Sequence, residues 1–419
     1  MEKIRDILIT QKREIEDRFK EKFIERDINY SKFENDLIKV ITGPRRAGKS
    51  FLGINVLKKK GDFGYINFED ERLLKIENYD DLINGLKLVY ENPKTILFDE
   101  IQNLKNWELF VNRLHRQGYN LIITGSNSKL LSKELGTHLT GRYIPIYVFT
   151  FSFSEKLKLF SEELTESEIK TKLIDYITYG GFPEPLVKNI NIKDYISTLF
   201  DGLIYKDIVR RYKIRKATEI DELATYLISN IGREFSYNKL TQIIGCRSVH
   251  TVEKYINFLE EAYLLFKIPR FSYKVGEQLK SNKKIYCIDN GFIYAKSLQS
   301  TGDIGYLYEN LVAIELKKQD YEGEIKVYYW KSEREEEIDF VIKKGVKIIG
   351  LIQVCCDLKD LRTKEREVRA LLKGQESLRC ENLIILNNEF EGEEIESWFG
   401  IRGKIRYIPI WKWLLKDRK

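Results

Sequence analysis

The chain has 419 residues, of which 43% are hydrophobic and 32% are charged, and its formal net charge at pH 7 is +7. The longest apolar runs are only strand-sized, which excludes a membrane-spanning protein, and the length exceeds that of one ordinary domain. Five cysteines without C-x-x-C spacing predict neither a zinc site nor a disulfide framework. The amphipathic N-terminus lacks the apolar segment of a secretory signal, so we expect a cytoplasmic protein.

Residues 1–36 are predicted to form an amphipathic helix and a linker. From 37 to about 150, the strand-like runs LIKVIT, FGYINF, TILFD, LIITG and YIPIYVF alternate with helical stretches. This alternation predicts βα units around a parallel sheet, an α/β fold.

The first strand runs into GPRRAGKS, which fits the pattern G-x-x-x-x-G-K-[ST] of a loop that binds nucleotide phosphates. Glycine is needed where backbone N–H groups turn inward around a phosphate. The lysine reaches the β and γ phosphates, and the serine hydroxyl is a natural Mg²⁺ ligand. A chance match is the alternative, but a strand before the motif and a helix after it argue against chance. The predicted ATP-binding residues are Gly43, Pro44, Arg45, Arg46, Ala47, Gly48, Lys49, Ser50 and Phe51.

The strand TILFD ends in Asp99 and is followed by Glu100. Beside a phosphate loop, the aspartate can hold the hydration shell of Mg²⁺, and the glutamate can orient the attacking water. We therefore predict an ATP hydrolase in which Lys49, Asp99 and Glu100 are catalytic. Ser50 and Asp99 are the predicted residues at the Mg²⁺ ion.

Further polar residues lie near the predicted site. The stretch LIITGSN places Ser126 and Asn127 at the tip of the next strand, where a side chain can sense the γ-phosphate. Arg142 in LTGRYIPI is a candidate arginine finger, although a structural role in a loop fits the sequence equally well. Glu69 and Asp70 are better explained as a solvated acidic turn than as neighbours of the phosphates.

The motifs follow one another along the chain as GPRRAGKS, YINFEDERL, LFDEIQ, TGSNSKLL, LTGRYIPIYVFTFSFSE, YGGFPEPL and YKDIVRRYKIR. In this combination the chain resembles the archaeal and bacterial AAA-type ATPases that carry an uncharacterised C-terminal domain. The resemblance covers nearly the whole chain. It implies an ASCE-type P-loop ATPase core, a winged-helix segment and a tail related to the PD-(D/E)XK nucleases, but it does not explain the stretch Gly180–Glu184. The predicted domains are 1–36 (helix and linker), 37–153 (ATPase core), 154–218 (helical), 219–300 (winged helix) and 301–419 (nuclease-like).

Residues 219–300 show the pattern of a winged helix. Three helical stretches, IDELATYLISNIG, SYNKLTQIIG and SVHTVEKYINFLEEAYLL, precede short strands around LLFKIPRFSYK and KKIYCID. Ser236 and Ser248 are suitable N-caps for the second and third helices. On the third helix an apolar face leaves other residues outward, and in a winged helix this helix enters the major groove. The predicted DNA contacts are Arg247, His250, Thr251 and Lys254.

Charge leaves two interpretations of this segment open. Residues 201–285 hold 16 Lys and Arg against 10 Asp and Glu, an excess typical of a surface that binds nucleic-acid phosphates. However, Glu253, Glu260 and Glu261 on the third helix would repel phosphates. A solvated lysine-rich surface would show the same excess, and winged helices also serve as packing or dimerisation modules.

The tail departs from a working nuclease. Such a site needs carboxylates for Mg²⁺ and a lysine that positions or stabilises the attacking hydroxide. Glu309 and Asp339 match the metal-binding positions, but Gln353 and Cys355 replace the glutamate and lysine of E-x-K. A thiol is neutral near pH 7, and burial would raise its pKa further. Lys359 could substitute for the missing lysine, an alternative that we consider weaker than a nuclease-like fold without cleavage, kept for DNA or protein contact.

The favoured function is ATP hydrolysis that moves or switches a DNA-associated winged helix and tail. One alternative is a nucleotide-dependent switch that binds a protein partner, and another is an ATP-gated nuclease. The sequence does not decide whether the chain forms a homo-oligomer.

Overall fold

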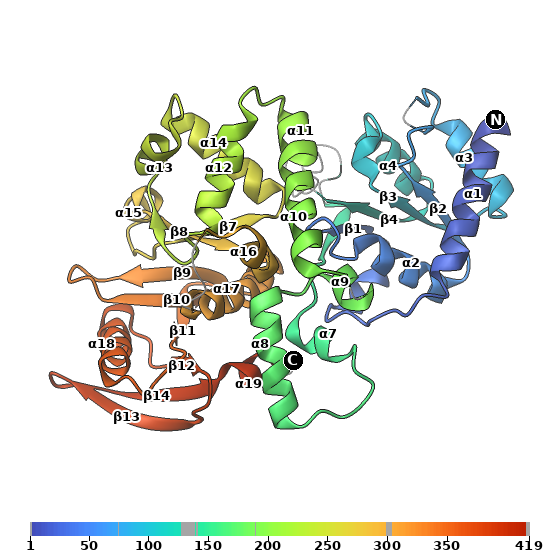
Figure 1. The fold of residues 1–419 in the computed structure, drawn as a ribbon. Coiled ribbons are helices and arrows are strands. Elements are labelled where there is room, and N and C mark those ends of the chain that lie inside the picture. Colours follow the sequence, from blue (N-terminus) through green and yellow to red (C-terminus); the bar gives the residue numbers. More distant parts are fainter. Residues whose placement is uncertain are drawn as a thin grey trace. The chain divides into compact units, whose positions relative to one another are not determined.

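The computed structural model describes residues 2–73, 75–126, 139, 141–188, 190–298 and 304–415. The chain forms two compact units (Figure 1), one of residues 1–151 with 261–263 and one of residues 152–260 with 264–419. In the described part of the chain, no helix is both long and apolar enough to cross a membrane.

The first unit is built on a five-stranded parallel sheet, which confirms the predicted α/β class. The strands lie in the order β2-β3-β4-β1-β5, and all neighbours are parallel. The strand of the phosphate loop, β1, is therefore separated by β4 from the strand that ends in Asp99, β3. The strands are β1 (Ile38–Thr42), β2 (Phe63–Asn67), β3 (Thr95–Asp99), β4 (Asn120–Gly125) and β5 (Tyr143–Tyr147). The helices are α1 (Glu2–Arg18), α2 (Lys49–Lys60), α3 (Asp80–Val89) and α4 (Trp107–Arg116).

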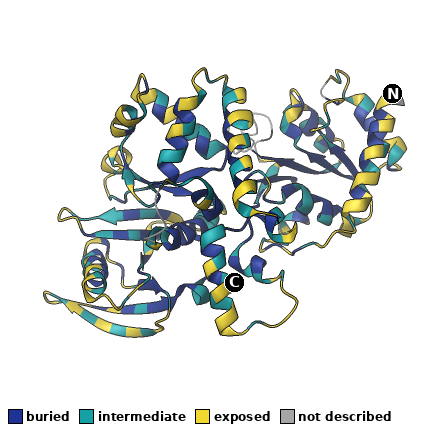
Figure 2. Cartoon of the chain, viewed as in Figure 1, coloured by how far each residue is buried: buried dark blue, intermediate teal, exposed yellow. Residues whose placement is uncertain are grey.

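Burial explains why the sheet was readable from the sequence. Every residue of β1 and β3 is buried, because helices cover both faces of a parallel sheet, and such strands appear as continuous apolar runs (Figure 2). Lys39 in β1 is also buried but is charged. Its ammonium donates to the carbonyl of Asn35 and, at 2.7 Å, to Oδ1 of Asn120, and burial lowers the pKa of Lys39 to about 8.

Helix α1 belongs to the core of this unit. Ile4, Leu8 and Ile15 are buried in the same apolar cluster as the sheet. Helix α3 approaches α1 at Gly85, where a Cβ atom would lie only 2.9 Å from Cδ1 of Leu8. The amphipathic pattern of residues 1–36 predicted α1, and the apolar face of α1 packs into the same core as the parallel sheet.

The second unit begins with helices and a small antiparallel sheet. The three predicted helical stretches form α12 (Ala217–Ile228), α13 (Tyr237–Ile244) and α14 (Val249–Glu261). Oγ of Ser236 and Oγ of Ser248 each accept a backbone N–H at 3.2 Å, as expected of N-caps. The small sheet has the order β6-β8-β7 and is antiparallel. The other elements of this part are α7 (Phe153–Leu157), α8 (Glu166–Tyr179), α9 (Pro183–Lys188), α10 (Ile192–Gly202), the π-helix η3 (Leu203–Val209), α11 (Arg210–Tyr212), β6 (Glu234–Phe235), β7 (Leu265–Pro269), α15 (Val275–Lys280), β8 (Lys283–Cys287) and α16 (Asn290–Lys296).

The tail of the second unit contains a six-stranded mixed sheet in the order β13-β14-β12-β11-β10-β9. The pairs β11–β12 and β12–β14 are parallel, and the others are antiparallel. The sequence predicts a helix at GYLYENLVAIELKKQ, strands at KVYYW, EIDFVI and KIIGLIQV, and then another helix and the strand NLIIL. The structure has these elements as α17, β9, β10, β11, α18 and β12, whereas β13, β14 and α19 were not predicted. The elements are α17 (Gly305–Tyr321), β9 (Lys326–Lys331), β10 (Glu337–Lys344), β11 (Lys347–Val354), α18 (Leu361–Leu378), β12 (Leu383–Asn387), β13 (Gly392–Trp398), β14 (Ile401–Pro409) and α19 (Ile410–Leu415).

The stretch Gly180–Glu184, whose purpose was not evident from the sequence, meets a buried aspartate. Gly180 has φ +75°, and a Cβ atom there would lie 1.8 Å from Oδ1 of Asp289. The Asp289 carboxylate accepts the N–H of Gly181 at 2.9 Å and the N–H of Gly291 at 2.8 Å, so it joins the end of α8 to the start of α16. Gly180 is therefore needed for this close approach, and Gly181 contributes its N–H group.

Two buried asparagines extend this connection into the tail. Nδ2 of Asn290 donates to the carbonyl of Ile177 at 2.7 Å and to that of Leu307 at 3.0 Å. Nδ2 of Asn310, on α17, donates to Oδ1 of Asn290 at 2.7 Å. Buried amides stabilise a fold when their hydrogen bonds are made and destabilise it strongly when they are not, so this network fixes α8, α16 and α17 together.

We expect Gly180→Ala to lower the free energy of unfolding by more than about 2 kcal/mol, because the new methyl group overlaps Asp289 and the backbone has a positive φ. Gly202→Ala is the matched control. Gly202 lies in α10 with nothing within 4 Å of its Cβ position, so alanine should leave stability unchanged or raise it. Urea unfolding of both variants measures the difference, and equal stabilities would contradict the assignment.

Candidate active site

The phosphate loop connects β1 to α2 and has a backbone that only glycine permits at its two ends. Gly43 has φ +146°, and a Cβ atom there would lie 1.9 Å from the carbonyl oxygen of Val148. Gly48 has φ +93° and immediately precedes α2. The loop therefore delivers the chain to a helix N-terminus, where free N–H groups and the helix dipole favour bound anions.

Lys49 and Ser50, the first two residues of α2, face inward. Lys49 is buried, and its Nζ donates to the carbonyl of Pro44 within the loop at 2.7 Å. Oγ of Ser50 donates to Oδ1 of Asp99, at the end of β3, at 2.7 Å. The structure thus brings together the serine and the aspartate that were predicted to share a metal ion.

Asp99 is buried and receives two more hydrogen bonds. Oγ1 of Thr124 donates to it from β4 at 2.5 Å, and the hydroxyl of Tyr65 donates from β2 at 3.2 Å. Burial and the neighbouring Glu100 raise the pKa of Asp99, whereas its hydrogen bonds oppose the rise. A cation beside this carboxylate would favour its ionised form.

Glu100 follows β3 in a strained conformation, with φ +50°. Its N–H donates to Oγ1 of Thr124 at 2.9 Å, and its carboxylate accepts from Oγ of Ser126 at 3.3 Å and from Nε2 of Gln102. Left-handed backbone at a residue other than glycine is concentrated at functional sites, where the surroundings hold it in place. Asn127, the predicted γ-phosphate sensor, lies outside the described residues.

The acidic turn after β2 has the local pairing expected of a surface turn. Oδ1 and Oδ2 of Asp70 accept from the guanidinium of Arg72 at 2.9 and 2.7 Å, and these hydrogen bonds lower the pKa of Asp70. Glu69 lies 3.7 Å from the guanidinium of Arg45 in the phosphate loop. Only Glu69 of this pair therefore has a charged contact with the loop.

Arg142 and the phosphate loop lie at opposite ends of the parallel strands. Strands β1 and β5 are parallel with Ile38 beside Tyr143, so Arg142 stands near the start of β1, whereas the loop follows its end. The five residues of β1 separate the two ends of the strand by about 16 Å. The guanidinium donates instead to Oδ1 of Asn112. A role as arginine finger would therefore require the phosphate loop of a second copy.

Arg26 contacts the loop and was not foreseen. It is buried, its Nη1 donates to the carbonyl of Ala47 at 2.8 Å, and its Nη2 donates to the carbonyl of Phe149. Its guanidinium lies 5.0 Å from the centre of the Phe151 ring. Arg26 therefore ties the phosphate loop to the segment after β5. Its distance along the chain from both partners hides this role from sequence patterns.

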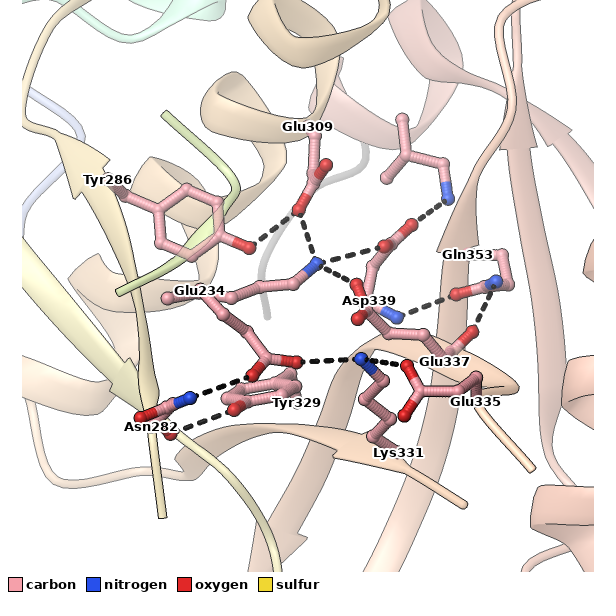
Figure 3. Close-up of polar contacts among 12 residues, drawn as sticks. Glu234, Asn282, Tyr286, Glu309, Tyr329, Lys331, Glu335, Glu337, Asp339 and Gln353 are labelled. Carbon is pink, nitrogen blue, oxygen red and sulfur yellow. Dashed lines mark hydrogen bonds and ion pairs between the residues drawn. The ribbon is translucent and has the colours of Figure 1, made fainter. Parts of the chain in front are cut away.

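In the tail, the structure brings Glu309, Asp339 and Gln353 together (Figure 3). Oε1 of Gln353 accepts the N–H of Asp339 at 2.6 Å, and Nζ of Lys284 lies within ion-pair distance of both Glu309 and Asp339. Lys284 comes from β8 and was not foreseen. Burial alone would lower the pKa of Lys284, but the surrounding carboxylates raise it well above its usual value. Burial and Glu309 raise the pKa of Asp339.

Two other residues of the predicted nuclease-like site do not supply a cation. Cys355 is buried, and burial raises the pKa of its thiol to about 11, so the side chain is neutral near pH 7, as expected. Lys359 is exposed and forms no ion pair within the described ranges. The positive charge in the cluster comes from Lys284 instead.

The predicted DNA-binding helix α14 exposes the expected side. His250 and Lys254 of α14 and Arg247 just before it are exposed, and Thr251 is half-buried, whereas Val252, Ile256 and Leu259 are buried. His250 lies 3.9 Å from Glu253 on the same face. This face therefore mixes positive and negative charge.

Most of the positive excess lies just before this region, in residues 206–216, where six basic residues accompany one acidic residue. All six basic side chains are exposed, and only Lys216 has an ion pair with a described residue, Glu219. The ring of Tyr212 stacks on that of Phe258 with centroids 3.7 Å apart, which holds this segment against α14. The basic residues are Lys206, Arg210, Arg211, Lys213, Arg215 and Lys216.

Comparison with known proteins divides the chain into three matched regions. Residues 35–157 match a family described as an AAA domain, and residues 170–302 and 304–412 match two families described as domains of unknown function, DUF8612 and DUF4143.

Similar proteins cover nearly the whole chain. The uncharacterized protein MJ1544 of Methanocaldococcus jannaschii is 37% identical, with 94% of this chain and 92% of that protein covered. An uncharacterized protein of Haemophilus influenzae is 29% identical, with 95% and 98% covered. Among solved structures, the Walker-type ATPase PABY2304 of Pyrococcus abyssi is 16% identical with a TM-score of 0.41, over 63% of this chain and 91% of that chain.

We expect Arg26→Met to destabilise the first unit by about 2–4 kcal/mol, because two buried carbonyls lose a charged donor. Nucleotide binding should weaken as the loop loses its support. Arg13→Met, at an exposed position of α1, is the matched control and should change neither quantity. Thermal unfolding with and without nucleotide tests both effects, and wild-type behaviour of Arg26→Met would contradict this role.

Proposed function

The chain belongs to the same family as the uncharacterized protein MJ1544 of Methanocaldococcus jannaschii, and we propose that its first unit is an ATP hydrolase. The observation that carries this proposal is the contact between Ser50 and Asp99, 2.7 Å apart, beside a loop shaped for phosphate. Among P-loop proteins, this pair joins the loop to the strand tip where hydrolysis takes place.

The residues present fit a nucleotide-bound Mg²⁺. A serine hydroxyl and a buried carboxylate are hard oxygen ligands, and a cation that brings its own waters and phosphate oxygens needs only one or two such groups. We assign Ser50 and Asp99 to this role. When bound, Mg²⁺ neutralises charge on the β and γ phosphates.

The residues of the loop and of the strand ends then have separate roles in binding and hydrolysis. The N–H groups of residues 45–50 bind the phosphates, and Lys49 exchanges its contact with Pro44 for the β and γ phosphate oxygens. Glu100 accepts a hydrogen bond from the attacking water and orients it toward the γ phosphate. Thr124 holds the backbone of Glu100 from the neighbouring strand.

We also propose that the second unit contacts DNA through one continuous basic surface. Residues 206–215 supply five basic side chains that form no ion pair with a described residue, and the stack of Tyr212 on Phe258 places them beside α14. The mixed charge of α14 makes it the weaker part of this surface. In this proposal the winged-helix arrangement presents the segment, and most phosphate contacts come from residues 206–215.

The tail, in our proposal, has a nuclease-like arrangement that does not cleave. The meeting of Glu309, Asp339 and Gln353 supports the likeness. The neutral thiol of Cys355 and the exposed position of Lys359 support the lack of cleavage, because neither provides the fixed positive charge near the attacking hydroxide.

The hydrolysis proposal is tested by two variants. Lys49→Ala should lose ATP binding or turnover, because the charge that bridges the phosphates is gone. Glu100→Gln should bind ATP but turn over at least about tenfold more slowly, because only the attacking water loses its partner. Glu71→Gln, an exposed carboxylate in the turn after β2, is the matched control. Steady-state hydrolysis at the wild-type rate in Glu100→Gln would sink the assignment.

The DNA proposal is tested by the salt dependence of binding. Each phosphate contact that is lost should reduce the slope of log K against log salt by about 0.9 on duplex DNA. We therefore expect glutamine at Arg210, Arg211 and Arg215 to flatten the slope more than glutamine at Arg247 and Lys254. Lys347→Gln, an exposed lysine of the tail, is the control. If the wild-type protein retains no DNA at low salt, a protein-binding switch becomes the favoured function.

A further inference from the structure

Glu309, Glu337 and Asp339 form a carboxylate cluster in the tail (Figure 3), and Lys284 of β8 lies within ion-pair distance of all three. Its Nζ lies 2.6 Å from Glu337, 3.1 Å from Glu309 and 3.4 Å from Asp339, and its side chain is only 3% exposed. An ammonium group has three N–H donors and no acceptor. Glu309 and Asp339 accept hydrogen bonds from it and Glu337 forms an ion pair with it, so the ammonium lies among three carboxylates as a bound cation would.

Several other polar atoms of the cluster are also hydrogen bonded within the protein. The hydroxyl of Tyr286 donates to Oε1 of Glu309 at 2.6 Å, and the N–H of Val354 donates to Oδ2 of Asp339 at 3.0 Å. Nε2 of Gln353 donates to the carbonyl of Glu337 at 3.0 Å. Lys284 and Tyr286 are two residues apart in β8, so their side chains lie on the same face of the strand. Both oxygens of Asp339 and one oxygen each of Glu309 and Glu337 therefore already face donors of the chain.

The backbone covers Glu309 from another direction. Gly232, in the turn between α12 and β6, has φ +77°, and a Cβ atom there would lie 3.0 Å from Oε2 of Glu309. The N–H of Gly232 donates to the carbonyl of Ile285, in β8, at 2.9 Å. The strand that carries Lys284 thus also holds the turn that lies over Glu309.

A divalent cation would need these same oxygens. Ca²⁺ and Mg²⁺ are held by carboxylates whose lone pairs are open to the ion, and a resident ammonium repels a second cation a few ångströms away. Across the described residues, no group of three or more His, Cys, Asp or Glu side chains is arranged to hold a metal ion. The cluster has its cation already.

We propose that the ammonium of Lys284 occupies the place of a metal ion among the tail carboxylates. It excludes divalent metal from them, so the tail does not cleave nucleic acid. This inference rests on the proposed nuclease-like arrangement of the tail and does not depend on ATP hydrolysis. In a nuclease the lysine would stand beside the metal, with the carboxylates left to the ion. Here the lysine takes the carboxylates itself.

The test uses the full chain without nucleotide and Mn²⁺ as the probe. Lys284→Met keeps the length of the side chain and removes the charge. We expect this variant to bind one more Mn²⁺ than the wild type, by electron paramagnetic resonance, with affinity at least about tenfold higher than any tail site of the wild type. Adding Asp339→Asn should abolish the gain. The ATPase rate of Lys284→Met should equal that of the wild type, which separates this test from the hydrolysis proposal.

Two outcomes would overturn the proposal. One is Mn²⁺ bound by the wild type and lost in Asp339→Asn, a comparison that stands even if Lys284→Met does not fold. The other is cleavage of supercoiled, branched or single-stranded DNA by the wild type in Mg²⁺ or Mn²⁺ that disappears in Asp339→Ala and in Lys284→Met. That result would make Lys284 the lysine of a working nuclease.

Discussion

The hydrogen bond from Ser50 to Asp99 constrains the whole first unit. Ser50 lies at the start of α2, which follows β1, whereas Asp99 ends β3, and β1 and β3 are not neighbours in the sheet. Strand β4 lies between the strand of the phosphate loop and the strand of Asp99, so the two strands are about 9.5 Å apart. Thr124 of β4 occupies the space between them. Its hydroxyl donates to Asp99 and accepts the N–H of Glu100, so one side chain fixes both acidic residues.

The second unit is organised by buried polar contacts between the small sheet and the tail. Lys284 reaches the tail carboxylates from β8, and Lys331 on β9 pairs with Glu234 of β6 at 3.3 Å (Figure 3). The N–H of Phe271, after β7, donates to the carbonyl of Tyr329 at 2.7 Å. All three strands of the small sheet thus have a contact with the tail at or beside them. Strand β7 of this small sheet follows α14, the helix against which the proposed DNA-binding segment packs.

Local signals in the sequence predicted the phosphate loop, the parallel strands and the helices of the middle segment, because each is determined by neighbours in the chain. Strand β13 was missed because its residues alternate between half-buried and exposed at the edge of the sheet, which gives no apolar run. Lys284 was missed for another reason. Its partners Glu309 and Asp339 are 25 and 55 residues away, and a lysine in a short basic strand looks like a surface residue. Arg26 was hidden in the same way, since Phe149 is 123 residues away.

The asparagine network has a consequence for how such proteins evolve. Asn310 in α17 bonds to Asn290, and its Oδ1 accepts the N–H of Cys287 at 2.8 Å, so the start of the tail completes the hydrogen bonding of the segment before residue 298. A recombination event that separated the two would leave buried amides unpaired on one side and three carboxylates without their lysine on the other. The two regions must therefore be inherited together, and an exchange of tails between relatives should survive only when β8 and α16 travel with the tail.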